Sequence, residues 1–478
     1  MAHLSRLFLQ HRDKFLLTTL LFFLASPLAV LSAELPPAVA NALKEGGIPL
    51  SSVAVVVHGV DADQALIWHN AQQAMNPASA MKLVTTYAAL ELLGPAYTWK
   101  TEALTDLAPL NGQTIGNLYL RGSGDPRLAL EQFWLLLRQL RARGVKDIGG
   151  DLILDRSAFA LPNHDAAEFD NEPLRPYNAG PDALLVNLKS LRLTLTAGAE
   201  KKVVKVIAET PSDDLRLDNR LKLTDDACGD WRERIKVKVN GESIDSIELT
   251  GSFSANCGDK ALNLSPWPAN VQVERLFRAL WRELGGTLRG KVRDGLTPTT
   301  ARPLAVQESP ALGEVVRDIN KYSNNVMARQ VFLTLAAERP ATPEGARRRI
   351  KAWLADKELK LPGLVLDNGS GLSRGEHISA DGLSQLLLAA WKSPVMPELM
   401  SSLPLAGVDG TLKKRLGDSA ASGRAHLKTG YLEGVRAIAG YVLDSSGKRW
   451  VVVFLINDQK SRQGKPAMDA LLRWVAER

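Results

Sequence analysis

Cysteine and histidine are scarce in this 478-residue sequence, which limits the kinds of site that it can build. The seven histidines include no His-x-x-x-His pair, the helical arrangement with which many enzymes bind zinc. The two cysteines, Cys228 and Cys257, are too few to form a zinc site unaided, and neither has a histidine placed as a catalytic base. We therefore expect no metal site.

Dense runs of basic residues are also missing. Lys and Arg number 59 against 52 Asp and Glu, which is a modest excess for this length. These residues form no run that could follow a nucleic-acid backbone, so we expect no nucleic-acid partner. Low-complexity tracts and internal repeats are absent too, and the composition is that of an ordinary folded protein.

The one conspicuous apolar run lies near the N-terminus, at residues 15–24, after three basic residues. This layout is typical of a secretory signal peptide covering residues 1–33; an uncleaved N-terminal anchor is the alternative. No later run is long enough to cross a bilayer, so we expect at most peripheral membrane association. In an oxidising compartment Cys228 and Cys257 are expected to form a disulfide.

The length predicts two or three domains. Strand patterns at both ends of the chain could share one antiparallel sheet, and helical patterns lie next to them. Short alternating segments dominate between about residues 100 and 265. We therefore predict a mixed α/β (α+β) domain formed by residues 34–100 and 266–478, with a β-rich insertion at residues 101–265.

The first of three short motifs with candidate chemistry is Ser79-Ala-Met-Lys82, near the start of a helix that ends at Gly94. Residues three apart on a helix point the same way, so the Ser79 hydroxyl and the Lys82 amine can meet. Serine needs a nearby base, and a lysine can act as one if burial or neighbouring cations lower its pKa. The pattern recurs at Ser445–Lys448 in a hairpin turn, so alone it is weak evidence.

The other two motifs lie far along the chain. Ser323 and Asn325 stand near the start of an apolar helix, where the hydroxyl could pass a proton and the amide could hold a substrate. A helix cap is the alternative, and Ser254-Ala-Asn256 has the same pattern. Lys428-Thr429-Gly430 occurs once, before an apolar strand, where Lys and Thr could bind a carboxylate and Gly would allow a close approach of substrate.

In this order the three motifs resemble those of penicillin-binding proteins and serine β-lactamases. The long β-rich stretch between Ser79 and Ser323 resembles specifically the D-alanyl-D-alanine carboxypeptidase/endopeptidase family, the class C low-molecular-mass penicillin-binding proteins (penicillin-binding protein 4 family). Residues 122–126, 367–374 and 440–442 support this likeness, which covers essentially the whole mature chain.

The resemblance implies a DD-peptidase domain with a central antiparallel sheet flanked by helices. It implies a periplasmic enzyme without a cofactor that removes D-alanine from peptidoglycan stem peptides ending in D-Ala-D-Ala. We also expect an endopeptidase activity on cross-links and covalent inhibition by β-lactams. Ser79 would form the acyl-enzyme, Lys82 would be its general base, and Ser323 would pass a proton to the leaving D-alanine.

Further residues are assigned to substrate binding by the same resemblance. Asn325 would position the substrate, and Lys428 and Thr429, beside Gly430, would bind its terminal carboxylate. The backbone N–H groups of Ser79 and Tyr431 would form the oxyanion hole, although relatives often carry a small hydroxyl residue at the position of Tyr431. Candidates for contacting a diaminopimelate side chain are Asp155 and Arg374.

Three other interpretations are open. Residues 371–375 match the Gly-x-Ser-x-Gly elbow of α/β-hydrolases, which would make Ser373 the nucleophile with His377 or His426 as base; the turn residues around it argue against this. A serine β-lactamase-like hydrolase is disfavoured by the long insertion. A non-catalytic peptidoglycan-binding protein is disfavoured by the intact Ser79 and Lys82.

Overall fold

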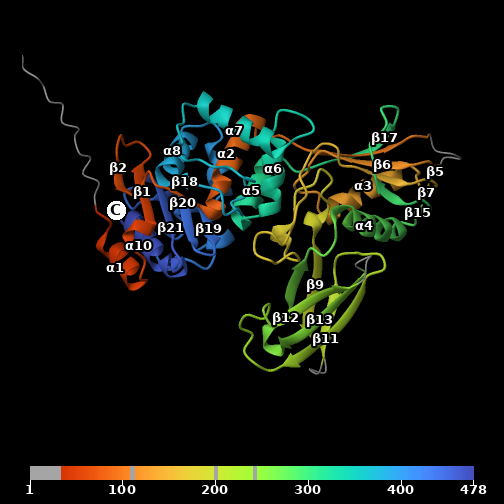
Figure 1. Ribbon diagram of the computed structural model, residues 1–478, viewed down its shortest axis with the longest axis horizontal. Coiled ribbons are helices and arrows are strands. Elements are labelled where there is room, and N and C mark those ends of the chain that lie inside the picture. Colours follow the sequence, from red (N-terminus) through yellow and green to blue (C-terminus); the bar gives the residue numbers. More distant parts are fainter. Residues whose placement is uncertain (1–33, 108–112, 199–202, 241–244) are drawn as a thin grey trace, which may run out of the picture.

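The computed structural model describes residues 34–107, 113–198, 203–240 and 245–478. The predicted signal peptide, residues 1–33, lies outside these ranges. Helices and strands are mixed along the chain, as the sequence predicts, and the terminal parts of the chain build one unit from which the middle part projects (Figure 1). None of the helices in the described ranges combines the length and the apolar character needed to span a bilayer.

A five-stranded antiparallel sheet, in the order β19-β20-β21-β1-β2, forms the centre of the terminal unit. Strand β1 pairs with β21, with Val55 opposite Phe454, so the two ends of the chain share one sheet. The motif Lys428-Thr429-Gly430 lies in β19, at one edge of this sheet. The strands are β1 (Val53–Gly59), β2 (Ala65–His69), β19 (Ala425–Leu432), β20 (Val435–Leu443) and β21 (Arg449–Asn457).

Both faces of this sheet are covered by helices because its central strands carry apolar side chains on both sides. Val55 and Phe454 face the helices α1 (Pro37–Glu45) and α10 (Lys465–Ala476). On the opposite face, Val56 and Val453 belong to a larger core that is shared with a second group of helices. These helices are α2 (Lys82–Leu93), α5 (Leu312–Tyr322), α6 (Asn325–Thr334), α7 (Pro343–Asp356), α8 (Ala380–Trp391) and α9 (Met396–Ser402).

Helix α2 lies at the centre of this core, and its first nine residues, 82–90, are all buried. A helix that is buried on every side needs apolar residues all round, and α2 has them apart from Lys82 and two threonines. It contacts α5, α6 and α7. A short two-stranded ladder pairs β3 (Ala74–Met75), which precedes the Ser79 turn in the chain, with β18 (Ile378–Ser379), which precedes α8.

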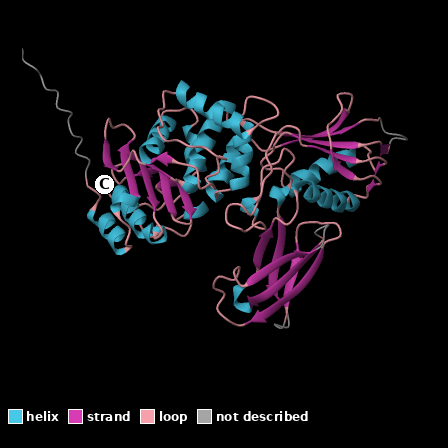
Figure 2. Cartoon of the chain, in the orientation of Figure 1, coloured by secondary structure: helices cyan, strands magenta, loops and turns pink. Residues whose placement is uncertain are grey.

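The middle of the chain forms two further units, one built from helices and strands and the other mainly from strands (Figure 2). In the first, the helices α3 (Leu130–Ala142) and α4 (Ala269–Glu283) share a core with the sheet β16-β8-β6-β4-β17, and a small sheet β15-β7-β5 lies beside it. Its strands are β4 (Lys100–Thr105), β5 (Thr114–Ile115), β6 (Leu118–Gly122), β7 (Asp147–Ile148), β8 (Leu152–Asp155), β15 (Thr287–Leu288), β16 (Val292–Asp294) and β17 (Arg302–Glu308).

The second unit consists of two three-stranded sheets, β10-β9-β14 and β11-β13-β12, around one apolar core. The predicted disulfide is confirmed: Cys228 and Cys257 are bonded, and both side chains contact this core. The strands are β9 (Leu191–Ala197), β10 (Val204–Ala208), β11 (Arg216–Thr224), β12 (Ile235–Asn240), β13 (Ser246–Ser254) and β14 (Lys260–Leu264).

The pairing of β17 with β4 bears on where the insertion ends. Glu308 lies opposite Lys100, so the chain enters and leaves the insertion on neighbouring strands. Helix α4 packs its Leu276 and Phe277 into the core of the insertion rather than onto the terminal unit. We therefore propose that the insertion extends from Lys100 to Glu308 and does not end at residue 265. The helical pattern after residue 271 shows an apolar face but not what covers it.

Candidate active site

Ser79 lies in a short 3-10 turn, Ala78–Met81, that leads directly into α2. The Lys82 Nζ atom donates hydrogen bonds to Ser79 Oγ at 3.0 Å, to Asn325 Oδ1 at 2.6 Å and to the Ser370 carbonyl. Lys82 is fully buried, whereas Ser79 is partly exposed. Burial and the charge of Lys428 lower the pKa of Lys82 well below its usual value. A base is thereby placed against a serine that solvent can reach.

The turn that holds Ser79 is itself constrained. Ala78 has a φ of 46°, a left-handed conformation that is unfavourable for alanine, and its N–H donates to Asn76 Oδ1 at 2.8 Å. Asn76 in turn donates from Nδ2 to the carbonyl of Ser373 at 2.9 Å. Strain of this kind persists only where neighbouring groups fix the backbone, and here a buried asparagine does so.

Ser323 also has a left-handed backbone, with a φ of 57°, at the C-terminal end of α5. The cap of α6 is Asn324, whose side chain accepts the N–H of Met327 at 3.1 Å. Ser323 and Asn325 are therefore not needed for that cap, and both turn toward the other motifs. Asn325 accepts from Lys82, and Ser323 Oγ accepts from Lys428 Nζ at 2.9 Å.

Lys428 is fully buried in β19, and burial lowers its pKa to about 7. Besides Ser323 it donates to the carbonyl of Thr429 at 2.8 Å. Thr429 is partly exposed, and its Oγ1 is 2.8 Å from that of Thr411. A Cβ at Gly430 would lie 2.5 Å from the carbonyl oxygen of Pro77, so only glycine lets this strand approach the Ser79 turn so closely. The three predicted motifs thus meet in one cluster.

The loop at residues 367–376 completes the cluster, and sequence reasoning missed how it does so. The Ser370 carbonyl accepts from Lys82, and the Gly369 carbonyl accepts from Thr85 Oγ1 at 2.6 Å. A Cβ at Gly371 would lie 2.0 Å from the carbonyl oxygen of Ala78, so this loop also presses against the Ser79 turn. The repeated glycines of this stretch are the signal that could have indicated such a close approach.

Residues 35–478 match the model of the D-Ala-D-Ala carboxypeptidase 3 (S13) family. The chain belongs to this family. A D-alanyl-D-alanine carboxypeptidase of Actinomadura sp. (strain R39) is 30% identical over 411 residues, which are 82% of this chain and 76% of that relative. The D-alanyl-D-alanine carboxypeptidase DacB of Haemophilus influenzae is 26% identical over 415 residues, with 85% of both chains covered. Family membership makes the chain a serine-peptidase hydrolase.

Solved structures agree with the fold of this S13 chain. The crystal structure of penicillin binding protein 4 (dacB) from Haemophilus influenzae matches with a TM-score of 0.75 at 24% identity, covering 91% of this chain and 99% of that one. The predatory endopeptidase Bd0816 of Bdellovibrio bacteriovorus matches with a TM-score of 0.54 at 16% identity, covering 90% and 93%. The DD-peptidase and β-lactamase-like fold predicted from the sequence is therefore confirmed.

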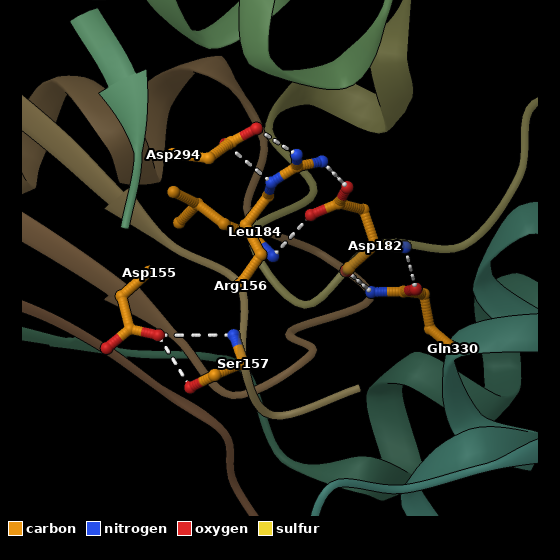
Figure 3. Close-up of polar contacts among 7 residues, drawn as sticks. All are labelled: Asp155, Arg156, Ser157, Asp182, Leu184, Asp294 and Gln330. Carbon is orange, nitrogen blue, oxygen red and sulfur yellow. Dashed lines mark hydrogen bonds and ion pairs between the residues drawn. The ribbon is translucent and has the colours of Figure 1, made fainter. Parts of the chain in front are cut away.

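Of the two residues predicted to contact a diaminopimelate side chain, Asp155 is used elsewhere in this S13 fold. It is 3% exposed, and one carboxylate oxygen accepts from the N–H and the hydroxyl of Ser157 at 3.1 and 2.6 Å (Figure 3). The other oxygen accepts the N–H of Thr297 at 2.8 Å. Both oxygens thus stabilise turns of the insertion, because a buried carboxylate needs such partners. The predicted contact of Asp155 with a diaminopimelate side chain stays a prediction.

Arg374, the other candidate, contacts residues that pack next to the Ser79 turn. Its guanidinium stacks over the ring of Phe169 at 4.8 Å and donates to the carbonyl of Glu433 at 3.0 Å. Phe169 comes from the insertion and packs in a small apolar cluster with Ala78, next to Ser79, and with Leu432 of β19. About half of the Arg374 side chain, 51%, is exposed. Arg374 therefore lies half-exposed at the rim of the site, with the Glu433 carboxylate 3.8 Å from its guanidinium.

Tyr431 follows the Lys428-Thr429-Gly430 motif and is 44% exposed. Its hydroxyl accepts from Arg462 Nε at 2.8 Å, and Arg436, opposite Tyr431 on β20, stacks over its ring at 4.5 Å. Two cations thus hold the phenol beside Thr429. The rim of the site is positively charged on this side.

The hydrolase-elbow interpretation finds no support. Ser373 Oγ accepts the N–H of Gly375 at 3.1 Å, and among the contacts of the described residues no histidine reaches this serine. His377 instead donates to the carbonyl of Gly375 at 2.8 Å, and His426 lies within β19. The chain after Ser373 continues into β18 and not into a helix, so an elbow is not formed.

The insertion also supports α6, which carries Asn325. Gln330 of α6 accepts the N–H of Asp182 at 2.9 Å and donates to its carbonyl at 2.8 Å, and the Asp182 carboxylate binds Arg156 at 2.7 Å (Figure 3). Arg156 also forms an ion pair with Asp294 of β16. These contacts join the first unit of the insertion to the helix that positions the partner of Lys82.

Proposed function

We propose that this protein is an exported serine-type D-alanyl-D-alanine carboxypeptidase that cleaves peptidoglycan stem peptides through an acyl-enzyme on Ser79. The observation that carries the proposal is that Lys82 Nζ contacts both Ser79 Oγ and Asn325 Oδ1 while Lys428 contacts Ser323. Family membership supports the activity. A nucleophile, a base, a proton relay and a cation for the substrate carboxylate are thereby available within one cluster.

In the first step, neutral Lys82 removes the proton from Ser79 Oγ, which attacks the carbonyl carbon of the penultimate D-alanine. Burial supports this role of Lys82 because it disfavours the ammonium form. The bond between this carbon and the nitrogen of the last D-alanine then breaks. The proton that Lys82 took up is passed by way of Ser323 to the departing amine, which leaves Lys82 neutral for the second step, and Lys428 supports the relay through its hydrogen bond to Ser323 Oγ.

The terminal carboxylate of the substrate is bound at β19. Lys428 provides the positive charge and Thr429 a hydroxyl, which is partly exposed beside Thr411. Gly430 keeps this strand close to the Ser79 turn, so the scissile bond can lie between them. The N–H groups of Ser79 and Tyr431 stabilise the oxyanion, and a backbone donor is not lost when Tyr431 replaces a smaller residue.

In the second step, water attacks the ester and Lys82 takes up its proton, which returns to Ser79 Oγ as the peptide leaves. A β-lactam forms the same ester with Ser79. Because its ring-opened product stays attached where a D-alanine would leave, we expect a long-lived acyl-enzyme. A β-lactamase would instead release this product rapidly.

We infer that the substrate carries an anionic side chain, such as that of diaminopimelate, which Arg374 binds. The exposed half of Arg374 and its position next to the Phe169 and Ala78 cluster support this. The exposed residues Thr411 and Tyr431 beside the carboxylate-binding strand leave room for a leaving group larger than D-alanine. We therefore also propose an endopeptidase activity on cross-linked peptides.

The periplasm is the compartment that we propose. The N-terminal sequence is typical of a signal peptide, and the disulfide between Cys228 and Cys257 fits an oxidising environment. Fractionation of cells that produce the full chain would test this, with N-terminal sequencing of the mature protein. Recovery of the protein from the cytoplasm with Met1 or Ala2 at its N-terminus would contradict it.

A fluorescent penicillin tests the catalytic proposal, with the labelled peptide identified by mass spectrometry. We expect a stable label on Ser79 that is absent from Ser79→Ala, and release of D-alanine from a D-Ala-D-Ala peptide by the wild type alone. Rapid loss of the label without peptide turnover would favour a β-lactamase-like hydrolase. A folded wild type with no label and no turnover would favour a non-catalytic peptidoglycan-binding protein.

A further inference from the structure

Glu376 is a buried carboxylate that the mechanism above does not use. It lies two residues before β18, and its side chain belongs to a residue with no exposed surface. One oxygen, Oε1, accepts the backbone N–H groups of Asp367, Asn368 and Gly369 at 3.1, 3.1 and 2.9 Å. The other oxygen, Oε2, is buried and has no hydrogen-bond partner among the described residues.

A buried carboxylate is unfavourable unless interactions with its neighbours offset the loss of hydration. Three N–H groups converge on one oxygen, and bonds of this charge-assisted kind are the strong ones in proteins. A neutral glutamine could accept the same bonds through its own oxygen. Burial raises the pKa of Glu376, while the three N–H groups lower it. The ionised form therefore depends on the groups around Glu376.

The first role of Glu376 is geometric. The three N–H groups that it binds belong to consecutive residues, and the residue that follows them is Ser370, whose carbonyl accepts from Lys82 Nζ. The Gly369 carbonyl is bound in addition by Thr85, which lies three residues after Lys82 on α2. The loop is thus held between Glu376 on one side and α2 on the other.

The second role is electrostatic. Lys82, Lys428 and Arg329 are all buried in this part of the molecule, and no two of them can be charged together without repulsion. Burial and the charge of Lys428 lower the pKa of Lys82, while the charge of Glu376 raises it. The charge of Glu376 also raises the pKa of Arg329, which burial lowers. A base works best with a pKa near the working pH, so this opposing charge keeps Lys82 from losing its basicity.

We propose that Glu376 is a positioning residue for the general base: it fixes the Ser370 carbonyl against Lys82 and supplies the buried negative charge that balances the cations around Ser79. It does not touch the substrate. This inference rests on the proposed role of Lys82 in the acylation of Ser79. It predicts two separable effects, one on the rate at every pH and one on the pH at which the enzyme becomes active.

The test measures the second-order rate constant of acylation by a fluorescent penicillin between pH 5 and pH 10. The rise of this rate with pH reports the pKa of the base in the free enzyme. In Glu376→Gln the acceptor oxygen is kept and the charge is lost. The ammonium form of Lys82 is then less stabilised, so its pKa falls and the midpoint of the rise moves to lower pH, by on the order of one pH unit.

The variant Glu376→Asp separates position from charge and remains informative if Glu376→Gln does not fold. It keeps the negative charge but shortens the side chain, so its oxygen no longer reaches all three N–H groups. We expect the plateau of the acylation rate to fall by about tenfold or more while the midpoint stays near that of the wild type. The matched control is Asp356→Asn, an exposed carboxylate at the end of α7, which should change neither quantity.

Each outcome decides the matter. If Glu376→Gln lowers the plateau without moving the midpoint, its charge has no influence on Lys82 and the electrostatic half of the inference is wrong. If Glu376→Asp keeps the wild-type plateau, the geometric half is wrong. A wild type that is not acylated on Ser79 at all contradicts the proposed function itself. The variants test only the role of Glu376, because their rates are compared with those of an active wild type.

Discussion

Lys428 Nζ lies 2.9 Å from Ser323 Oγ, although the two residues are 105 positions apart in the sequence. One stands on the edge strand of the sheet and the other at the end of α5, so the contact joins the sheet to the helical part of the terminal unit. Lys428 is fully buried and has no carboxylate partner among the described ion pairs. A buried cation with no carboxylate in direct contact is a feature retained for function and not for stability.

Replacement of Lys428 by methionine should therefore stabilise the protein while removing its activity. Burial holds the pKa of Lys428 at about 7, below the value of an unfolded lysine. Between these two values the unfolded chain binds more protons than the folded one, so this lysine makes stability rise with pH from about 7 upward. We expect Lys428→Met to unfold at higher temperature at pH 7, with a gain of about 1–4 kcal/mol, and to lose acylation by penicillin.

Calorimetry at pH 6, 7 and 9 checks this prediction. The advantage of Lys428→Met should be largest at pH 6 and shrink as the pH rises above 7, because the free-energy cost of keeping this lysine uncharged in the folded protein falls as the pH approaches the pKa of an unfolded lysine. The exposed Lys413 of the neighbouring loop offers a control, since Lys413→Met removes a hydrated cation and should leave stability and its pH dependence unchanged. A Lys428→Met protein that is no more stable than the wild type at pH 7, or a gain that does not shrink as the pH rises, would contradict the argument.

Gly430→Ala should uncouple the strand from the Ser79 turn. A Cβ at this position would lie 2.5 Å from the carbonyl oxygen of Pro77 and 3.1 Å from Ala78 Cβ, so β19 must move outward. We expect acylation to slow by about 100-fold or more, because small displacements of catalytic groups have effects of this size. The edge position of β19 should limit the loss of stability.

The control for this variant is Gly417→Ala, because a Cβ at Gly417 would meet nothing within 4 Å. Its acylation rate and unfolding temperature should equal those of the wild type. Stopped-flow fluorescence with a labelled penicillin measures both variants. A Gly430→Ala protein that is acylated at the wild-type rate would show that the close approach of the two backbones has no catalytic value.

The three motifs can be predicted from the sequence because each of them is local. Ser79 and Lys82 are one helical turn apart, and a lysine at this spacing reaches the serine wherever the helix lies. Spacing does not show that Ser323 and Lys428 lie next to Ser79 and Lys82. That expectation comes from the order of the motifs, which is the order found in a known family. The shared sheet of the two chain ends is also predictable, since both ends offer apolar hairpin strands.

Other parts of the site cannot be read from the sequence. Ser370 acts through its carbonyl oxygen, which every residue has, so its side chain gives no signal. The role of Glu376 depends on three N–H groups that face it only in the folded chain. The sequence does not show that both carboxylate oxygens of Asp155 accept hydrogen bonds from turns of the insertion. In each case tertiary contacts decide what a residue does.

Gln330→Met should weaken the connection between the insertion and α6. Gln330 is fully buried, and its amide pairs with both the N–H and the carbonyl of Asp182. Methionine fills a similar volume but leaves these two backbone groups without partners, at about 1–3 kcal/mol for each. We expect the free energy of unfolding to fall by about 2–4 kcal/mol and acylation to slow, because Asn325 starts the same helix.

Chemical denaturation and penicillin acylation measure these two effects. Gln385→Met is the matched control, since Gln385 is exposed on α8 and its side chain, among the described residues, hydrogen-bonds to Asp381 on the same helix. It should change stability by less than about 0.5 kcal/mol. If Gln330→Met is as stable and as rapidly acylated as the control, the insertion does not support the active site through this contact.

The disulfide offers the opposite case, a strong local effect on stability that should not reach the catalytic cluster. Cys228 and Cys257 close a loop with a sequence separation of 29 within the core of the second insertion unit, and the Ser79 cluster shares no residue with that core. Replacement of both cysteines by serine should destabilise this unit by about 2–4 kcal/mol. Because the unit has a core of its own, we expect it to unfold first, as a separate transition in calorimetry.

Below the temperature of that transition, the rate of acylation at Ser79 should equal that of the wild type. A parallel loss of acylation at temperatures where the unit is still folded would mean that the two parts of the molecule are coupled, and the insertion would then have to be treated as part of the active-site scaffold.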